Sequence, residues 1–472
     1  MSSSSSKDGK GKMTDCHQVI DAMGGLSYTQ IKMIALAAQV WSADGAELLM
    51  ISGITDSVAE EWQMSSLAQG LIVTVVYTGI WLGNILSGPF SSKVGRKAAM
   101  VTSFAGTFIF SCLTATSQNT AQLMFWRVFV GTFVGLGQPA SLASNQEYSP
   151  ENLGLIVCMC AQSVFSFGEI YAGFLLMCDD PSLANLHWRW ILVMGGLPAG
   201  LNTILCALYL KDTPAYLASK SRIEEATEYL EELAEESGHT ELIGQINLAF
   251  PDEHEDAQPL SETMGKQMAV IMGSKLWYPT LASMFSAFTI NYAYYGCLFA
   301  FPQVLPAISG DGTASQLMIG ALCEVPGYLL GGYLGYKWER RSTLRLTFTG
   351  IAVFNILFII GANNYGSLIS KMFVYIGYYG IKMSPTIGYV VIYHCATEIY
   401  PTSSRAVGSG LVLAAGRLSA MASPLIFELI ESSTGEWLLY FVLVAALAVA
   451  NVYIVKFVPE SYELDGLSSK IH

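Results

Sequence analysis

Long apolar runs separated by short polar connections dominate the pattern of hydrophobic and polar positions along this chain. A helix needs about 20 predominantly apolar residues to cross the hydrocarbon core of a bilayer. Twelve runs reach or approach this length, and the sequence therefore predicts an all-α membrane protein with twelve transmembrane helices. The predicted spans are 33–55, 67–90, 98–116, 121–143, 153–176, 190–210, 278–304, 314–336, 343–362, 368–396, 404–428 and 435–458.

One long connection divides the predicted spans into six and six. It covers residues 211–277, and its stretch from Lys211 to Lys275 holds 14 acidic residues against five basic ones. Apolar residues at a helical period within it predict an amphipathic helix at Ile223–Glu236 on the cytoplasmic face. The expected organisation is a cytoplasmic tail (1–32), a six-helix half (33–210), the cytoplasmic acidic loop (211–277), a second six-helix half (278–458) and a cytoplasmic C-terminal tail (459–472).

Composition and charge agree with a membrane protein. Hydrophobic residues make up 52% of the chain and charged residues only 13%, whereas soluble globular proteins carry about 25% charged residues. The net charge of −13 argues against nucleic acid as a partner, because nucleic acid binds basic surfaces. The nine cysteines show no spacing typical of a metal site, and no metal or cofactor is expected.

Lysine and arginine in the short connections predict the orientation of the spans. The second connection contains Lys93, Arg96 and Lys97, and the eighth also carries several basic residues. Five of the odd-numbered connections contain none. The even-numbered connections, the acidic loop and both termini are therefore expected in the cytoplasm.

Two short stretches recur at matching places in the two halves. The stretch Gly88-Pro-Phe-Ser-Ser-Lys-Val-Gly-Arg96-Lys97 follows the second span, and Gly332-Tyr-Leu-Gly-Tyr-Lys-Trp-Glu-Arg340-Arg341 follows the eighth. Glu147-Tyr-Ser-Pro150 follows the fourth span, and Glu398-Ile-Tyr-Pro401 follows the tenth. The repetition predicts duplicated six-helix halves, and transporters commonly bind substrate near the midplane between such repeats.

These stretches resemble the major facilitator superfamily, whose hallmark is a Gly-x-x-x-Asp-Arg-x-Gly-Arg-Arg loop in each half. Three further signatures resemble its sugar and organic-ion porter branch: Arg127-x-x-x-Gly131-x-x-x-Gly135-x-Gly137, Trp188-Arg-Trp190 and Asp212-Thr-Pro-Ala-Tyr-Leu217. Within that branch, Ala43-Asp44-Gly-Ala-Glu47, Tyr294-Tyr295-Gly296, Glu324-Val-Pro-Gly327 and Ala415-Gly-Arg417 look like the synaptic-vesicle-two-related transporters. The resemblance runs from about Val19 to Pro459, and it implies a twelve-helix carrier that works by alternating access.

The chain departs from the superfamily pattern at the two loop aspartates. Ser92 and Tyr336 stand where the family has aspartate. In the family these charges are thought to hold the cytoplasmic helix ends together, so we expect a weaker latch here or a substitute partner such as Glu147. The residues expected to take part in gating are Arg96, Lys97, Glu147, Arg340, Arg341, Glu398 and Arg405.

Ionisable residues inside the predicted spans are the first candidates for a transport site, because a charge in the bilayer is costly and usually functional. Asp44 and Glu47 lie three residues apart and therefore share a helix face. Together with Glu169 they are the predicted sites for a proton or a cation. The alternative is that these carboxylates only join helices through hydrogen bonds.

Other polar and aromatic residues are expected to line the substrate cavity. Lysine and arginine could neutralise the acids or hold an anionic group, and tyrosine can contact a cation through its ring. The predicted cavity residues are Gln138, Tyr292, Tyr295, Glu324, Lys382 and Arg417. The sequence does not pair these residues with one another.

A secondary transporter fits these observations better than an enzyme does. The chain has no phosphate-binding Gly-x-x-x-x-Gly-Lys-Ser/Thr run, no Gly-x-Ser-x-Gly and no His-Glu-x-x-His. We therefore expect a monomeric, multi-pass carrier of a small organic ion or polar metabolite, coupled to protons, in the plasma membrane or an intracellular vesicle membrane. Two alternatives stay open: an uncoupled facilitator of a sugar-like substrate, and a transporter-like receptor or vesicle protein without net flux.

Overall fold

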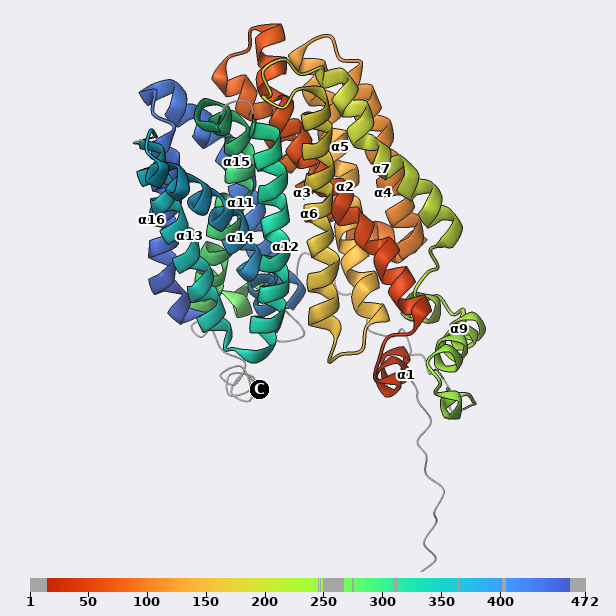
Figure 1. Ribbon diagram of the computed structural model, residues 1–472. Helices are drawn as coiled ribbons and strands as arrows, with labels where there is room; N and C mark the ends of the chain where they lie inside the picture. The colour runs from red at the N-terminus through yellow and green to blue at the C-terminus, as the bar shows by residue number, and fades with distance from the viewer. Residues whose placement is uncertain are drawn as a thin grey trace, which may run out of the picture.

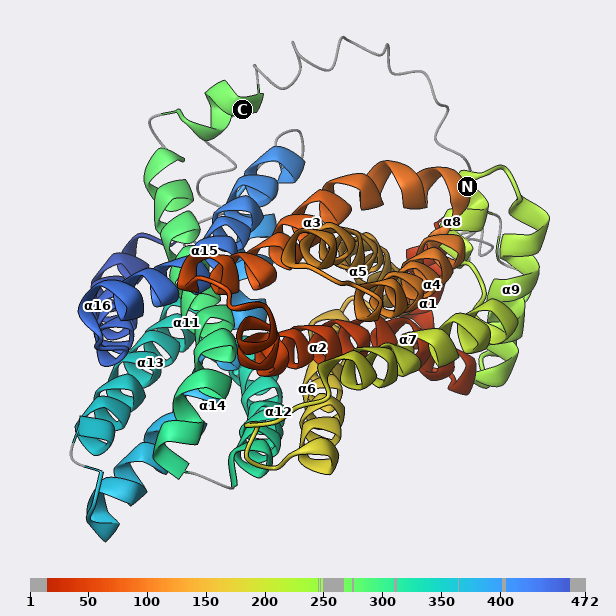
Figure 2. The ribbon, with the colours of Figure 1, turned by 90° about the horizontal axis from the view of Figure 1, so that it is seen from above.

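The described residues form twelve long helices, and each overlaps one predicted span. The computed structural model describes residues 15–244, 246, 248, 267–273, 276–309, 312–363, 365–400 and 405–458. The N-terminal group comprises α2 (Tyr28–Trp62), α3 (Ser66–Val94), α4 (Arg96–Ala115), α5 (Thr120–Tyr148), α6 (Gly154–Asp179) and α7 (Trp188–Tyr209). The C-terminal group comprises α11 (Trp277–Ser309), α12 (Thr313–Lys337), α13 (Arg340–Asn363), α14 (Leu368–Glu398), α15 (Arg405–Thr434) and α16 (Leu438–Ile454). The two groups stand side by side (Figures 1 and 2), which confirms the predicted fold class.

Nine of the described helices qualify as membrane spans by length and hydropathy. The other three long helices are α5, α11 and α14. They carry polar side chains that are buried inside the bundle, including Arg127, Gln138, Asn291 and Lys382. Their lower hydropathy therefore reflects polar groups that face other helices rather than lipid.

The same helix pairs pack together in both halves. In the N-terminal half α3 packs on α5, α2 on α6, and α4 on both α5 and α7. The corresponding pairs in the C-terminal half are α12 with α14, α11 with α15, and α13 with both α14 and α16. This repetition is the structural counterpart of the duplicated sequence stretches. Between the halves, α3 contacts α15, α6 contacts α12, and α2 contacts α11.

Glycines allow α3 and α5 to approach closely. A Cβ atom at Gly131 would lie 2.1 Å from the Val76 carbonyl oxygen, and one at Gly79 would lie 2.2 Å from the Val128 carbonyl oxygen. Real Cβ atoms do not come so near to backbone atoms, so only glycine fits at these positions. The glycine-rich signature of the fourth predicted span therefore serves close packing of α5 against α3.

Gly131→Ala is expected to destabilise the N-terminal half by about 1–3 kcal/mol, because the added methyl group must push α3 and α5 apart. The matched control is Gly88→Ala on α3, where a Cβ atom would meet nothing within 4 Å. Thermal unfolding of the purified variants checks this prediction. A melting temperature for Gly131→Ala equal to that of the control would contradict it.

Three shorter helices lie at one end of the N-terminal half (Figure 1): α1 (Cys16–Met23), α8 (Pro214–Ser219) and α9 (Ile223–Glu236). Helix α9 has the bounds that the periodicity of the acidic connection predicts. Helix α1 lies in the segment where only a tail is predicted. Its start is capped by the Asp15 side chain, which accepts a hydrogen bond from the His17 backbone N–H.

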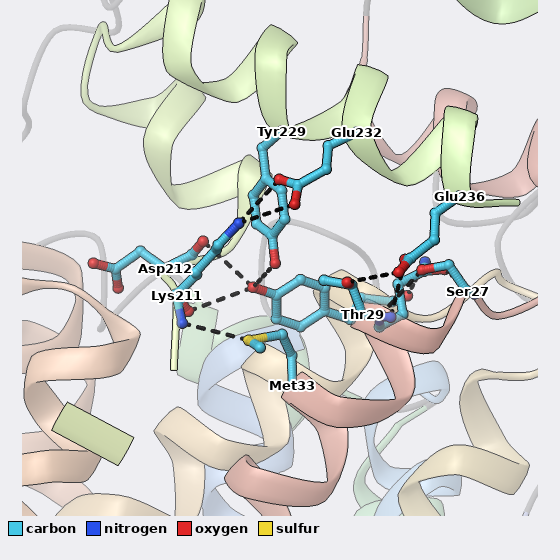
Figure 3. Close-up of polar contacts among 10 residues, drawn as sticks. Ser27, Thr29, Met33, Lys211, Asp212, Tyr229, Glu232 and Glu236 are labelled. Carbon is cyan, nitrogen blue, oxygen red and sulfur yellow. Dashed lines mark hydrogen bonds and ion pairs between the residues drawn. The ribbon is translucent and has the colours of Figure 1, made fainter. Parts of the chain in front are cut away.

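Side-chain contacts fix α9 to the helix ends beside it (Figure 3). Glu236 accepts hydrogen bonds from the backbone N–H and the hydroxyl of Thr29 at 3.0 and 3.1 Å, at the start of α2. The Tyr229 hydroxyl lies 3.1 Å from that of Tyr148, at the end of α5. Burial is the main cause that raises the pKa of Tyr229 to about 12. Helix α9 is therefore a packed part of the N-terminal half.

Candidate functional site

Eight acidic or basic side chains are buried among the long helices in the part of the chain that the structure describes. They are Glu428 on α15 and seven others: Asp44, Glu47, Arg127, Glu169, Glu324, Lys382 and Arg417. None is more than 5% exposed. Burying a charge costs several kcal/mol unless a partner compensates for it. Each of the seven has such a partner, and together they form three separate groups.

The first group places Lys382 of α14 between two glutamates, one from each half. Its ammonium Nζ lies 2.8 Å from Oε2 of Glu169 on α6 and also forms an ion pair with Glu324 on α12. Glu324 Oε2 accepts hydrogen bonds from the hydroxyls of Tyr294 at 2.8 Å and Ser166 at 3.1 Å. This group therefore has two carboxyl groups for one ammonium.

The second group links the halves through Gln138 of α5. Its amide Nε2 donates to Oδ2 of Asp44 on α2 at 2.6 Å, and its Oε1 accepts from Nη2 of Arg417 on α15 at 2.8 Å. Arg417 Nη1 also lies 3.4 Å from the Tyr295 hydroxyl, which is 3.1 Å from the Tyr389 hydroxyl. One carboxylate and one guanidinium are thus held apart by a single neutral amide.

The third group lies wholly within the N-terminal half. Nη1 of Arg127 donates to Oε2 of Glu47 at 2.6 Å, and the Ser111 hydroxyl donates to the other carboxylate oxygen of Glu47. Asp44 and Glu47 lie on the same helix but have different partners. Asp44 is linked to Arg417 of the C-terminal half through Gln138, whereas Glu47 bonds to Ser111 on α4 and Arg127 on α5.

The structure separates the two tyrosines that are predicted to line the cavity. Tyr295 belongs to the second group. Tyr292 stacks on Phe288 and Tyr440 inside the C-terminal half, with ring centroids 5.9 and 5.5 Å away. Tyr292 therefore packs among aromatic rings of the C-terminal half and is not part of the second group. Tyr294 contacts the first group instead, because α11 is buried on all sides from Ala293 to Phe301 and presents different faces to different neighbours.

At the end of the bundle near α9, Glu147 is the partner of Arg96. Arg96 Nη2 lies 2.7 Å from Glu147 Oε1, and Thr213 also donates to this carboxylate. The Lys97 backbone N–H donates to Asp212 at 2.9 Å, and the Lys97 side chain borders a cavity of about 430 Å³. The substitute partner expected from the sequence is present, and its contacts lie within the N-terminal half.

The other residues expected at the gating loops make different contacts. Arg341 Nε donates to the Val458 carbonyl oxygen at 2.6 Å, and Arg340 Nη1 lies 3.8 Å from the Cys395 sulfur. Glu398 ends α14 and Arg405 begins α15, but their side chains lie outside the described residues.

Sequence reasoning missed Tyr294, Tyr389 and Ser111, which complete the three groups. Arg127, which begins the glycine-rich signature of the fourth predicted span, is also absent from the predicted site residues. Helix α2 runs seven residues beyond the predicted end of the first span, to Trp62. Because the longer helix places Glu47 farther from its end, the pairing with Arg127 could not be read from the predicted spans. The one available signal for Tyr294 was its place beside Tyr295.

Comparisons with known proteins agree with the fold and with the duplicated halves. A family model described as "Sugar (and other) transporter" matches residues 28–465. The synaptic vesicle 2-related protein of Pongo abelii is 24% identical over 444 residues, covering 89% of this chain and 77% of that protein. The niacin transporter NiaP of Acinetobacter baylyi is 24% identical over 415 residues, covering 86% of this chain and 87% of that protein.

A solved structure has the same architecture. The inward open conformation of the xylose transporter XylE from E. coli superposes with a TM-score of 0.74 at 18% identity, covering 93% of this chain and 99% of that one. With this coverage, the likeness extends over both halves. The chain is therefore a multi-pass integral membrane protein that belongs to the sugar (and other) transporter family of the major facilitator superfamily, and it resembles the synaptic-vesicle-two-related members of that family.

Proposed function

We propose that this protein is a proton-coupled carrier that moves a small organic ion by alternating access. The observation that carries the proposal is the buried group of Glu169, Lys382 and Glu324, which contains one more carboxyl group than ammonium. If both glutamates were ionised, one negative charge would be buried without compensation. That arrangement costs several kcal/mol, and uptake of one proton removes the cost.

The hydrogen bonds favour Glu169 as the residue that takes up this proton. Glu324 forms an ion pair with Lys382 and accepts hydrogen bonds from two hydroxyls, Tyr294 and Ser166, and each of these three partners stabilises its ionised form. Glu169 has Lys382 at one oxygen, and its other oxygen lies 3.5 Å from the Tyr294 hydroxyl. That hydroxyl has a single proton to donate, and the shorter contact is to Glu324.

The position of the group links the proton to alternating access. Glu169 belongs to α6 in the N-terminal half, whereas Lys382 and Glu324 belong to α14 and α12 in the C-terminal half. A rocking motion of one half against the other separates Glu169 from Lys382 and exposes it to one side of the membrane. Glu169 then loses or gains its proton, and the ion pair forms again when the halves close.

We place the substrate at the second group, beside Asp44, Gln138, Tyr295 and Arg417. This group lies between the halves, where alternating access gives a bound molecule a route to either side. Asp44 remains a candidate for binding a cation, and Glu47 is a second candidate for proton binding through its pair with Arg127. A relative of this chain is named a niacin transporter, which supports a small organic solute.

The end of the bundle that carries α1 and α9 is proposed to face the cytoplasm, with Arg96 and Glu147 stabilising it. In a cysteine-free background, Glu224→Cys, at an exposed position of α9, is expected to react with a membrane-impermeant maleimide only after the cells are permeabilised. Ala184→Cys, in the exposed connection between α6 and α7, is expected to react on intact cells that display the protein at their surface. The reverse pattern would contradict this orientation.

Uptake by proteoliposomes tests the proposed function. The purified protein is reconstituted, and a mixed pool of sugars, organic cations, organic anions and zwitterions is offered with the outside about 2 pH units more acidic. We expect one solute class to accumulate and to leave again when a protonophore is added. Solute entry that stops when the inside and outside concentrations are equal, without dependence on pH, would indicate the uncoupled facilitator. Binding without flux would indicate the receptor-like alternative.

A further inference from the structure

We infer that Tyr294 is a positioning residue of the carrier: its hydroxyl keeps the coupling proton on Glu169, and its ring connects that proton to the second group. The inference rests on the proposed function, because it concerns the proton of the same carrier. Tyr294 lies on α11 and is 5% exposed. Its hydroxyl belongs to the first group, whereas its ring packs against tyrosines of the second.

The two glutamates of the first group compete for one proton. Glu169 and Glu324 both contact the ammonium of Lys382. They also lie close enough to hydrogen-bond to each other, and such a bond forms only when one of the two carboxyl groups carries a proton. The proton can therefore pass from one carboxyl oxygen to the other without leaving the group.

The Tyr294 hydroxyl selects the glutamate that holds the proton. It lies 2.8 Å from Glu324 Oε2 and 3.5 Å from Glu169 Oε1, and it has a single proton to donate. While it donates to Glu324, it stabilises the ionised form of that carboxylate, and the coupling proton stays on Glu169. If the hydroxyl turned to Glu169, the proton would move from Glu169 to Glu324. A hydrogen bond to a charged acceptor changes this preference by about tenfold or more.

The other titratable side chains around the first group do not compete for the proton near neutral pH. They are phenols and thiols, which ordinarily release their protons only at alkaline pH. Those described residues that interact electrostatically with Glu169, Glu324 or Lys382 are Tyr77, Cys297, Cys323, Tyr328 and Tyr378. The proton is therefore divided between the two carboxyl groups.

The ring of Tyr294 connects the proton to the second group. Its centroid lies 5.1 Å from that of Tyr295 and 6.1 Å from that of Tyr389, and the hydroxyls of these two tyrosines belong to the second group. The ring also lies 5.9 Å from Phe165 of α6, in the N-terminal half. Because packed rings move together, a solute that shifts Tyr295 or Tyr389 also moves the Tyr294 hydroxyl. Proton binding and solute binding thus share one residue, as reciprocal coupling between two sites requires.

Chemical labelling of protonated carboxyl groups tests the position of the proton without any solute. Dicyclohexylcarbodiimide modifies protonated carboxyl groups in apolar surroundings, and peptide mass spectrometry locates the modified residue. In wild type we expect Glu169 to be labelled at least about tenfold more than Glu324. Tyr294→Phe keeps the ring but lacks the hydroxyl, and we expect its ratio of Glu169 to Glu324 labelling to fall by about tenfold or more.

Tyr440→Phe is the matched control for the labelling. Tyr440 is a buried tyrosine of α16 whose hydroxyl donates to the backbone carbonyl oxygen of Tyr292 at 3.3 Å, outside the first group, so the wild-type ratio is expected. Labelling of the buried Glu428 shows that the reagent enters the bundle. An equal ratio in Tyr294→Phe and wild type would overturn the inference. Labelling of Glu428 without either glutamate of the first group would also contradict the proposed function.

The number of protons moved per solute molecule tests the connection to the second group. Proteoliposomes with a pH-sensitive dye inside receive the mixed solute pool at equal pH on both sides, and mass spectrometry measures solute entry. Tyr294→Phe is expected to admit solute with at most about half the wild-type ratio of protons to solute, because two glutamates then share the proton. A folding defect alone would lower both rates and leave the ratio unchanged. An unchanged ratio in Tyr294→Phe would overturn the inference, whereas solute entry through wild type without protons would contradict the proposed coupling.

Discussion

Glu169→Gln is expected to abolish proton-driven accumulation while leaving exchange of solute intact. The glutamine keeps the size and hydrogen bonds of a protonated glutamate, but it cannot release a proton when the halves open. A gradient of about 2 pH units supplies about 2.7 kcal/mol per proton, enough for roughly 100-fold accumulation by wild type. The variant is expected to reach only equal concentrations on both sides, as measured by uptake into proteoliposomes.

Glu428→Gln is the matched control for this experiment. Glu428 is also a buried glutamate, 2% exposed, but it lies on α15 away from the group around Lys382. The control is expected to accumulate solute as wild type does. Accumulation by Glu169→Gln at the level of the control would show that the proton binds elsewhere, and the pair of Glu47 with Arg127 would then be the next candidate.

Arg127→Gln is expected to lower the free energy of unfolding by about 3–5 kcal/mol, because it leaves the buried Glu47 carboxylate without its cation. Ser111 remains as a hydrogen-bond donor, but a neutral hydroxyl does not compensate for the charge. Equilibrium unfolding in mixed detergent micelles measures the loss.

The double variant Arg127→Gln with Glu47→Gln separates charge from packing. It removes both charges and leaves two amides that can bond to each other, so most of the lost stability is expected to return. If the double variant were as unstable as the single one, the loss would come from packing around the Arg127 side chain, and the ion pair would not be its cause.

The number, order and approximate bounds of the long helices could be predicted from the sequence. Each span needs about 20 apolar residues whatever its neighbours are, so local composition suffices. The amphipathic helix at Ile223–Glu236 follows from periodicity in the same way. The predicted bounds of the spans are less accurate than their number. Helix α2, for example, continues to Trp62, because polar residues can extend a helix beyond its apolar part.

The grouping of the buried charges could not be predicted in this way. The ionisable residues Asp44, Glu169, Glu324 and Arg417 all stand out in the sequence because each interrupts an apolar run. Their partners depend on helix rotation and tilt. Lys382 contacts Glu169 although 213 positions separate them, and no local pattern specifies that contact. The same limit explains why Tyr292 was expected in place of Tyr294, since α11 has no lipid-facing side in this region.

Solute-driven proton movement tests the central claim most directly. Proteoliposomes with a pH-sensitive dye inside receive, without an imposed gradient, the solute that wild type accumulates. Wild type is predicted to acidify the interior as solute enters, whereas Glu169→Gln exchanges the same solute without any change in internal pH. Acidification by Glu169→Gln equal to that of wild type, or solute entry through wild type without acidification, would contradict the account.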